Sequence, residues 1–300
     1  MERREKTKLK VVFVGHVDSG KSSLCGRLMM EGGGIDRRTL EKVEKEWEDM
    51  GRPFFTLASI PNESARLCGN ANIFIDPFVF ESNMFTFSFW DCPGMRDFSR
   101  GLIHEGTNAQ VAILVVSATN GEFEAGICRD GQTRTHISLC KSLGIDNLIV
   151  VVNKMDTVDW DHDRFLEIKS ELCKWLDRIG YNSDFIPIIP ISTLGGEFVS
   201  RKVSHTKKGV PNRVKYYRGS GSNSSNSNNN NEEEEEEINE EDKVDLSWVT
   251  TPTLFQSLND LSTPPDISTK PTRVVIEVIF DVQFQIRKGK VLLNFLIFFQ

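Results

Sequence analysis

The stretch that decides the fold is Gly15-His16-Val17-Asp18-Ser19-Gly20-Lys21-Ser22, which comes directly after the apolar run 11–14. It fits the pattern G-x-x-x-x-G-K-[S/T], and a helical pattern over residues 23–30 follows it. The glycines let the backbone bend so that successive N–H groups and the helix N-terminus face phosphate oxygens. Lys21 is expected to reach the β and γ phosphates, and the Ser22 hydroxyl to bind Mg²⁺. The order of strand, loop and helix therefore predicts a nucleotide-phosphate site made by Gly15 to Ser22 and the adjoining Ser23.

Further short apolar runs alternate with helical patterns along the chain. They cover residues 73–80, 85–90, 111–116, 148–152 and 186–191. Continuous apolar runs are typical of strands that are covered on both faces, so the sequence predicts an α/β fold in three layers with a mostly parallel sheet. One covering helix is visible as an apolar stripe between residues 165 and 179, and Gly180 stands where a glycine would end it.

Two further motifs follow apolar runs, where the carboxyl end of a strand would present them. Asp91-Cys92-Pro93-Gly94 follows the run 85–90, so Asp91 is expected to reach Mg²⁺ through water and the Gly94 N–H to sense the γ-phosphate. Asn153-Lys154-Met155-Asp156 follows the run 148–152. The Asp156 carboxylate would accept from the N1–H and N2 amine of guanine, whereas adenine has no matching donors. Lys154 would lie along the purine face and Asn153 would brace the phosphate loop.

Composition excludes several other classes of protein. The net charge of −7 comes from one tract, because residues 232–245 hold ten acids and one base. A general binding role for acidic or basic partners is therefore not indicated. The six cysteines form no C-x-x-C pair, which argues against a disulfide framework or a zinc site. The charged start and the short apolar run at residues 291–299 predict neither a secretory signal nor a membrane span, so we expect a cytoplasmic protein.

The chain divides in the sequence into a large domain and the start of another. We expect a nucleotide-binding domain over residues 1–263, with a disordered low-complexity insertion at 201–246, which is first basic, then rich in Ser and Asn, then acidic. A role of this segment in binding RNA or a partner is the alternative. A proline-rich linker at 264–272 then leads to residues 273–300, which read as an incomplete β-rich second domain.

With these motifs in order, the chain resembles the translational GTPases. The likeness rests on residues 15–22 and 153–156, and on the segments GGID at 33–36, RDF at 96–98, GEFEAGI at 121–127 and GQTR at 131–134. It implies a P-loop G domain that binds GTP or GDP with Mg²⁺, and places Ser192-Thr193-Leu194 where a backbone N–H meets the guanine O6. It also implies a monomer that works with aminoacyl-tRNA, the ribosome and a nucleotide-exchange factor. The incomplete second domain, which would be a β-barrel in this family, weakens the expectation of tRNA delivery.

Two positions depart from the family pattern in ways that affect catalysis. The family places a histidine after D-x-P-G to orient the attacking water, and here that residue is Met95. The threonine that binds Mg²⁺ in the family corresponds to Asn72, whose amide oxygen is a partial substitute. The sequence thus leaves two hypotheses: a GTP hydrolase with impaired turnover, or a non-catalytic guanine-nucleotide-binding module that occupies partners through a surface such as 131–140. An ATP-dependent P-loop kinase is disfavoured by Asp156.

Overall fold

The chain folds into two compact units, residues 1–264 and 265–300. The structure is a computed structural model. It describes residues 6–32, 35, 37–52, 55–67, 78–82, 84–91, 109–129, 131–209, 243–261, 286–287 and 290–291.

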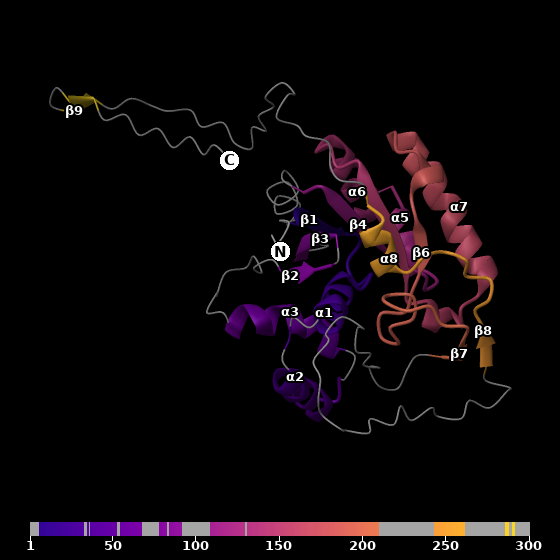
Figure 1. Ribbon diagram of the computed structural model, residues 1–300. Coiled ribbons are helices and arrows are strands. Elements are labelled where there is room, and N and C mark those ends of the chain that lie inside the picture. Colours follow the sequence, from indigo (N-terminus) through magenta and orange to yellow (C-terminus); the bar gives the residue numbers. More distant parts are fainter. Residues whose placement is uncertain are drawn as a thin grey trace, which may run out of the picture. The chain divides into compact units, whose positions relative to one another are not determined.

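The first unit alternates strands and helices (Figure 1). Its strands are β1 Thr7–Val14, β2 Phe78–Glu81, β3 Phe85–Asp91, β4 Val111–Ser117, β5 Asn147–Asn153, β6 Ile188–Pro190, β7 His205–Lys207 and β8 Lys243–Asp245. Its α-helices are α1 Lys21–Glu31, α2 Arg37–Asp49, α3 Thr56–Leu67, α5 Glu122–Ile127, α6 Gln132–Ser142, α7 His162–Ile179 and α8 Leu254–Asn259. The described part of this unit also has two 3₁₀ helices, η3 Met155–Val158 and η4 Ser183–Phe185.

The main sheet has six strands in the order β2-β3-β1-β4-β5-β6. All neighbours run parallel except β2, which pairs antiparallel with β3 at one edge. The chain passes from β1 to one side of the sheet, through β2 and β3, and then continues from β4 to the other side. The border between β1 and β4 is therefore the point where the strand order reverses, and the loops at the carboxyl ends of these strands lie together there. The predicted α/β fold with a mostly parallel sheet is confirmed.

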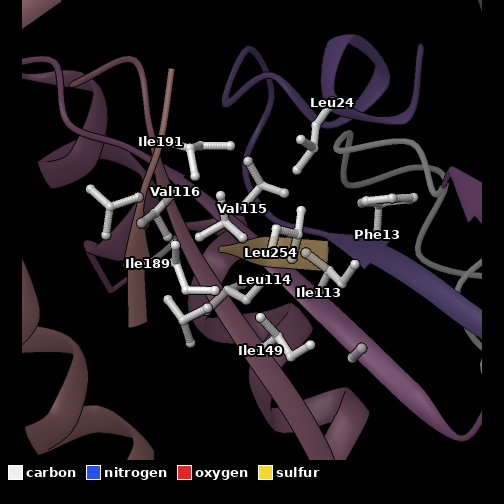
Figure 2. Packing of buried hydrophobic residues seen from close by; sticks show 14 of the residues in the cluster. Phe13, Leu24, Ile113, Leu114, Val115, Val116, Ile149, Ile189, Ile191 and Leu254 are labelled. Atoms are coloured by element: carbon white, nitrogen blue, oxygen red, sulfur yellow. The ribbon is translucent and has the colours of Figure 1, made fainter. Parts of the chain in front are cut away.

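The central strands are buried on both faces. Every residue of β4 is buried, as are residues 148–153 of β5 and the last four residues of β1. Because successive strand residues point to opposite faces, this pattern requires cover on both sides of the sheet. Figure 2 shows Phe13, Ile113 and Ile149 from three neighbouring strands within one cluster, which Leu24 of α1 and Leu254 of α8 also join. A rigid sheet thus supports the loops at its carboxyl edge.

The helix read from the apolar stripe is α7, whose buried residues include Phe165, Ile168 and Leu172. The Asp161 carboxylate accepts a hydrogen bond from the N–H of Asp163 and so caps the helix start. Gly180 ends the helix with φ +99°, a left-handed conformation that glycine adopts without strain.

The two ends of the predicted insertion are paired with each other. Strands β7 and β8 form an antiparallel ribbon, in which Thr206 faces Val244, and the N–H of Gly209 donates to Asp159 Oδ1 at 2.7 Å. Cross-strand hydrogen bonds and the burial of Thr206 and Leu246 thus stabilise the two ends of the segment 201–246. Residues 210–242 lie outside the described residues.

The second unit is described only at two short strands. These are β9 Ile286–Arg287 and β10 Lys290–Val291, which pair antiparallel. In the described parts of both units, no helix is long and apolar enough to cross a bilayer.

Candidate functional site

Four loops at the carboxyl edge of the sheet carry the residues singled out from the sequence. They follow β1, β4, β5 and β6, and one further residue, Asp91, ends β3. In parallel sheets this edge is where ligands bind, at the point of strand reversal. The parallel pairing of β1 with β4, and of β4 with β5, brings residues that are more than a hundred positions apart into one site.

The loop between β1 and α1 bends tightly at its second glycine. Gly20 has φ +93°, and a Cβ atom there would lie 2.1 Å from Asn153 Nδ2, so no other residue fits. The loop then enters α1 directly, so the first N–H groups of the helix have no partner inside the helix. Lys21, at the first position of α1, is 6% exposed, and its ammonium donates to the carbonyl oxygen of His16 within the same loop. A cationic group and a helix N-terminus together make this loop suited to an anion.

Ser22 and Asp91 form a direct pair beside this loop. The Ser22 hydroxyl donates to Asp91 Oδ2 at 2.5 Å, across 69 residues of sequence. The second carboxylate oxygen, Oδ1, is buried and has no hydrogen-bond partner among the described residues. Burial raises the pKa of Asp91, while the bond from Ser22 and the charge of Lys21 oppose that shift. One carboxylate and one hydroxyl at this spacing are oxygen ligands suited to a Mg²⁺ ion that keeps several waters.

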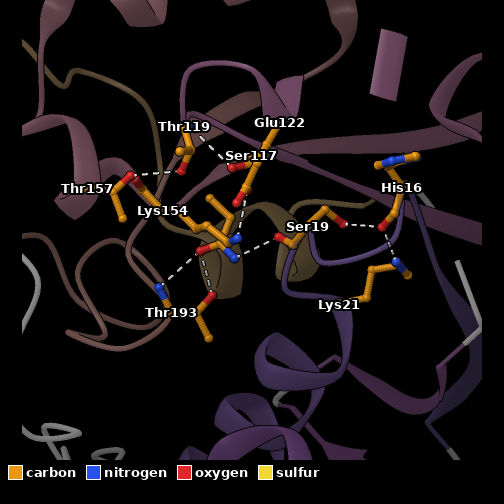
Figure 3. A network of polar contacts seen from close by, with 10 residues as sticks. His16, Ser19, Lys21, Ser117, Thr119, Glu122, Lys154, Thr157 and Thr193 are labelled. Carbon is orange, nitrogen blue, oxygen red and sulfur yellow. Dashed lines mark hydrogen bonds and ion pairs between the residues drawn. The ribbon is translucent and has the colours of Figure 1, made fainter. Parts of the chain in front are cut away.

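Asn153, the last residue of β5, joins two of the loops. Its Nδ2 donates to the carbonyl oxygen of Ser19 at 3.0 Å, and its Oδ1 accepts from the Thr193 N–H at 3.1 Å and hydroxyl at 2.7 Å. Figure 3 shows this network between Ser19 and Thr193. The side chain is 2% exposed, so these contacts are shielded from water. The loop after β1 and the loop after β6 are thus fixed relative to each other.

Asp156 lies in η3, two residues beyond the bend at Lys154, where φ is +62°. The residue is 5% exposed, and burial raises the pKa of its carboxyl group, although a hydrogen bond with the Ser192 side chain opposes the shift. Ser192 also accepts the N–H of Gly195 at 3.1 Å. A buried carboxylate with one hydroxyl partner retains acceptor capacity for donors of a ligand.

The loop after β4 contacts the loop after β5 through side chains. Lys154 Nζ lies 2.7 Å from Glu122 Oε2, and the hydroxyls of Thr119 and Thr157 lie 2.9 Å apart (Figure 3). Glu122 also bonds Ser117, and despite a desolvation contribution these contacts lower the pKa of its carboxyl group. The ion pair thus fixes the end of the Lys154 side chain against the loop after β4.

Two residues of the site were not identified from the sequence. His136 of α6 is fully buried, and its Nδ1 accepts the N–H of Gly15 at 3.1 Å. Arg27 of α1 is fully buried and donates to the carbonyl oxygens of Thr193 and Leu194. The only signals in the sequence were a charged residue inside an apolar helix and the pair of Arg27 with Glu31 one turn later.

The remaining predicted residues differ in what the structure shows of them. Val17 and Asp18 form the tip of the loop after β1, where Asp18 has φ +59° and Val17 is 38% exposed. Ser23 lies within the first turn of α1, and Met155 is wholly buried in the core. Gly94 and Met95, predicted as catalytic, and Asn72, predicted as a metal ligand, lie outside the described residues. In the part of the chain that the structure describes, no cluster of three or more His, Cys, Asp or Glu side chains could hold a metal by itself.

Comparison with known proteins relates most of the chain to one family. The profile of the family described as elongation factor Tu GTP binding domain matches residues 6–262. Elongation factor 1-alpha of Entamoeba histolytica is 46% identical over 195 residues, which cover 65% of this chain and 44% of that protein. Elongation factor 1-alpha of Thermofilum pendens is 34% identical over 281 residues, which cover 93% of this chain and 56% of that protein.

A solved structure shares the fold. The S. cerevisiae Ski7 GTPase-like domain, bound to GDP and inorganic phosphate, superposes with a TM-score of 0.60 at 19% identity, over 85% of this chain and 49% of that chain. The chain spans about half the length of the relatives it matches. Since the family profile covers most of the chain and all the loops described above, the chain belongs to the family of the elongation factor Tu GTP binding domain, among the translational GTPases.

Proposed function

We propose that this chain binds GTP and GDP together with Mg²⁺ at the four loops, and hydrolyses GTP as an elongation-factor-like GTPase. The observation that carries the proposal is the double contact of Asn153, which ties the phosphate-type loop at Ser19 to the loop at Thr193. Because Asn153 also begins the loop that carries the buried Asp156, this loop is fixed relative to the loop that carries Lys21. A nucleotide held by its phosphates at one loop would therefore present its base to a carboxylate.

Base selection follows from the donors and acceptors of the two purines. The Asp156 carboxylate, when ionised, only accepts hydrogen bonds, and guanine offers the N1–H and the N2 amine. Adenine would leave the buried carboxylate unpaired, and this kind of mismatch gives discrimination of ~10⁴ to 10⁵. Lys154, held by Glu122, would cover one face of the base.

The phosphates would meet the start of α1. Lys21 would exchange its contact with the His16 carbonyl for phosphate oxygens, which are stronger partners because they are charged. Ser22 and Asp91 fit Mg²⁺, because the pair supplies two oxygen ligands and the buried Asp91 Oδ1 has no other described partner. When bound, this ion would neutralise charge on the phosphate oxygens.

Met95 stands where the family has the histidine that orients the attacking water, so it bears directly on hydrolysis. A thioether is at most a weak acceptor and donates no hydrogen bond, so it orients water poorly. Loss of a positioned acid or base costs ~10² to 10⁴ in rate. Met95 and Asn72 together favour the second candidate function, a guanine-nucleotide-binding module that engages the partners of translation factors without turnover.

Contacts with aminoacyl-tRNA, the ribosome and an exchange factor, a cytoplasmic address and a monomeric state are also proposed. They rest on membership of the family, and the chain matches only 44% of the length of one relative and 56% of another. The surface proposed for partner binding lies on residues 131–140, most of which belong to α6 and of which Thr135 and Ser138 are exposed.

Base selection is tested by titration of labelled GDP and ADP against the wild type and Asp156→Ala. We expect the wild type to favour GDP by at least 10³, and the variant to lose most of that preference. The matched control is Asp159→Ala in the same loop, because Asp159 is exposed and its carboxylate accepts the Gly209 N–H. An unchanged preference in Asp156→Ala would refute guanine recognition by this site.

Turnover is tested by phosphate release from GTP under single-turnover conditions, in the wild type and Met95→His. We expect the variant to be faster by ~10² or more, because a histidine can hold the attacking water. Equal rates well above the uncatalysed reaction would show that Met95 does not limit catalysis. Tight GTP binding with no release in either protein would select the non-catalytic module.

A further inference from the structure

Arg27 is a fully buried arginine in the middle of α1. Taking a guanidinium out of water is costly, and replacing a buried ion pair by apolar side chains of similar size is often neutral or stabilising. Packing alone therefore gives no reason for an arginine at this position. The groups that it holds in place are the more informative feature.

The guanidinium binds two consecutive peptide groups of the loop after β6. Its Nε donates to the Thr193 carbonyl oxygen at 2.8 Å, and one terminal nitrogen donates to the Leu194 carbonyl oxygen at 2.5 Å. The other terminal nitrogen lies 3.7 Å from Glu31 Oε1, one turn along the same helix. The rigid fork of donors thus fixes the orientation of two neighbouring carbonyl groups, which a lysine could not do.

The orientation of a carbonyl fixes the N–H that follows it. In a trans peptide the C=O and the N–H point in opposite directions, so holding the Thr193 carbonyl towards Arg27 turns the Leu194 N–H away from it. The neighbouring donors are already used, since the Thr193 N–H bonds Asn153 and the Gly195 N–H bonds Ser192. Among the described residues, the Leu194 N–H has no acceptor. It is the one donor of this turn that is available to a ligand.

We infer that Arg27 is a positioning residue for guanine recognition, which holds the loop 192–194 so that the Leu194 N–H meets the oxygen at position 6 of the purine. The inference rests on the proposed function. It also makes α1 a common support for both ends of the nucleotide, since Lys21 and Ser22 begin the helix that carries Arg27. Asn153 ties the same two loops from the side of β5.

Position 6 and position 2 of the base are then read by separate groups. Asp156 would read the N1–H and the N2 amine, whereas Arg27 binds the carbonyl oxygens of Thr193 and Leu194 on the other loop. Two analogues separate the readings. In 6-thioguanosine diphosphate a sulfur, which is a weaker acceptor, replaces the position 6 oxygen, whereas inosine diphosphate lacks only the N2 amine.

The test measures the affinity of GDP, 6-thioguanosine diphosphate and inosine diphosphate for the full chain and its variants. For Arg27→Met we expect the preference for GDP over the thio analogue to fall about threefold to tenfold, the worth of one hydrogen bond. The preference for GDP over inosine diphosphate should remain as in the wild type. Arg27→Lys keeps the charge but has a single ammonium in place of the fork of donors. Its preference for GDP over the thio analogue should therefore lie between those of the wild type and Arg27→Met.

The matched control is Arg164→Met on α7. Arg164 is also nearly buried and also donates to a backbone carbonyl, that of Ala118, while its other hydrogen bonds go to Glu124 and Glu167 and not to the loop 192–194. We expect this variant to lose stability in thermal unfolding and to keep both ratios.

Three results would overturn the inference. One is an unchanged preference for GDP over 6-thioguanosine diphosphate in Arg27→Met or, if that variant does not fold, in Arg27→Lys. Another is an equal loss of affinity for all three nucleotides, which would make Arg27 a residue of the fold only. If the wild type binds ADP as well as GDP, the proposed function itself fails and the inference fails with it.

Discussion

His136 shows how a single side chain can depend on staying uncharged. Its Nδ1 accepts the Gly15 N–H, which requires an imidazole without a proton on that nitrogen. Burial lowers the pKa of His136 from 6.5 to about 4, and the charges of Lys21 and His16 add to this effect. The loop after β1 is therefore attached to α6 through a group that remains neutral at physiological pH.

The consequence for stability has a definite sign. A histidine with a lowered pKa in the folded state contributes fully above the unfolded pKa of 6.5, and the contribution is lost as the pH falls towards about 4. In His136→Asn the amide oxygen can accept the same N–H but does not titrate. We expect the free energy of unfolding of the wild type to fall by about 2 kcal/mol relative to this variant between pH 7 and pH 5.

Urea denaturation at a series of pH values measures this difference. If the free energy of unfolding changes with pH in the same way in the wild type and in His136→Asn, the protonation of His136 does not contribute to the pH dependence of stability. His162→Asn, at the exposed start of α7, is the control and should follow the wild type.

At the scale of elements, α7 illustrates how the end of a helix depends on one backbone conformation. Gly180 has φ +99°, and a Cβ atom there would meet nothing within 4 Å, so strain and not crowding opposes other residues. We expect Gly180→Ala to lower the stability by about 1 kcal/mol, and Gly180→Asn to lower it less because asparagine tolerates the left-handed region. Thermal unfolding of the three proteins measures the order. Equal losses in both variants would contradict this explanation.

The elements were largely predictable from the sequence because their signals are local. Continuous apolar runs marked β1, β3, β4 and β5, and the stripe ending at Gly180 marked α7. The pairing of β7 with β8 was missed, since three-residue strands within a charged, low-complexity stretch have no apolar alternation to reveal them.

Lys21 and Asp156 could be singled out because each lies in a loop motif that carries its own chemistry, and their roles in nucleotide binding stay predictions. Arg27 and His136 were not predictable, because their roles arise from contacts with residues 166 and 121 positions away in the sequence. No local pattern records such contacts. Only the strand order, which places the loops after β1 and β6 at one edge, brings them together.

At the scale of the whole molecule, binding of a nucleotide should raise the free energy of unfolding of the first unit. A ligand at a hundred times its dissociation constant stabilises the folded state by about 2.7 kcal/mol. For a domain of this size we expect GDP with Mg²⁺ to raise the melting temperature by roughly 5 to 10 °C. Chelation of Mg²⁺ should reduce the shift, and ADP should produce little.

Ser22→Ala separates the metal from the nucleotide in this measurement. Removing the hydroxyl that pairs with Asp91 should reduce the additional shift caused by Mg²⁺ and leave the shift caused by GDP alone. Ser170→Ala, on the exposed side of α7, is the control. An additional Mg²⁺ shift of the same size in Ser22→Ala would exclude this serine as a ligand.

The β7–β8 ribbon has one more consequence, for what this domain can carry. Lys207 pairs with Lys243, so the polypeptide departs from the domain and rejoins it at neighbouring points. The entropic free-energy cost of closing a loop between such points rises by only about 0.6 kcal/mol for each doubling of its length. A foreign domain or a fluorescent reporter whose own termini are adjacent could therefore replace residues 210–242 at small thermodynamic cost. The ribbon is thus a suitable site for domain insertion.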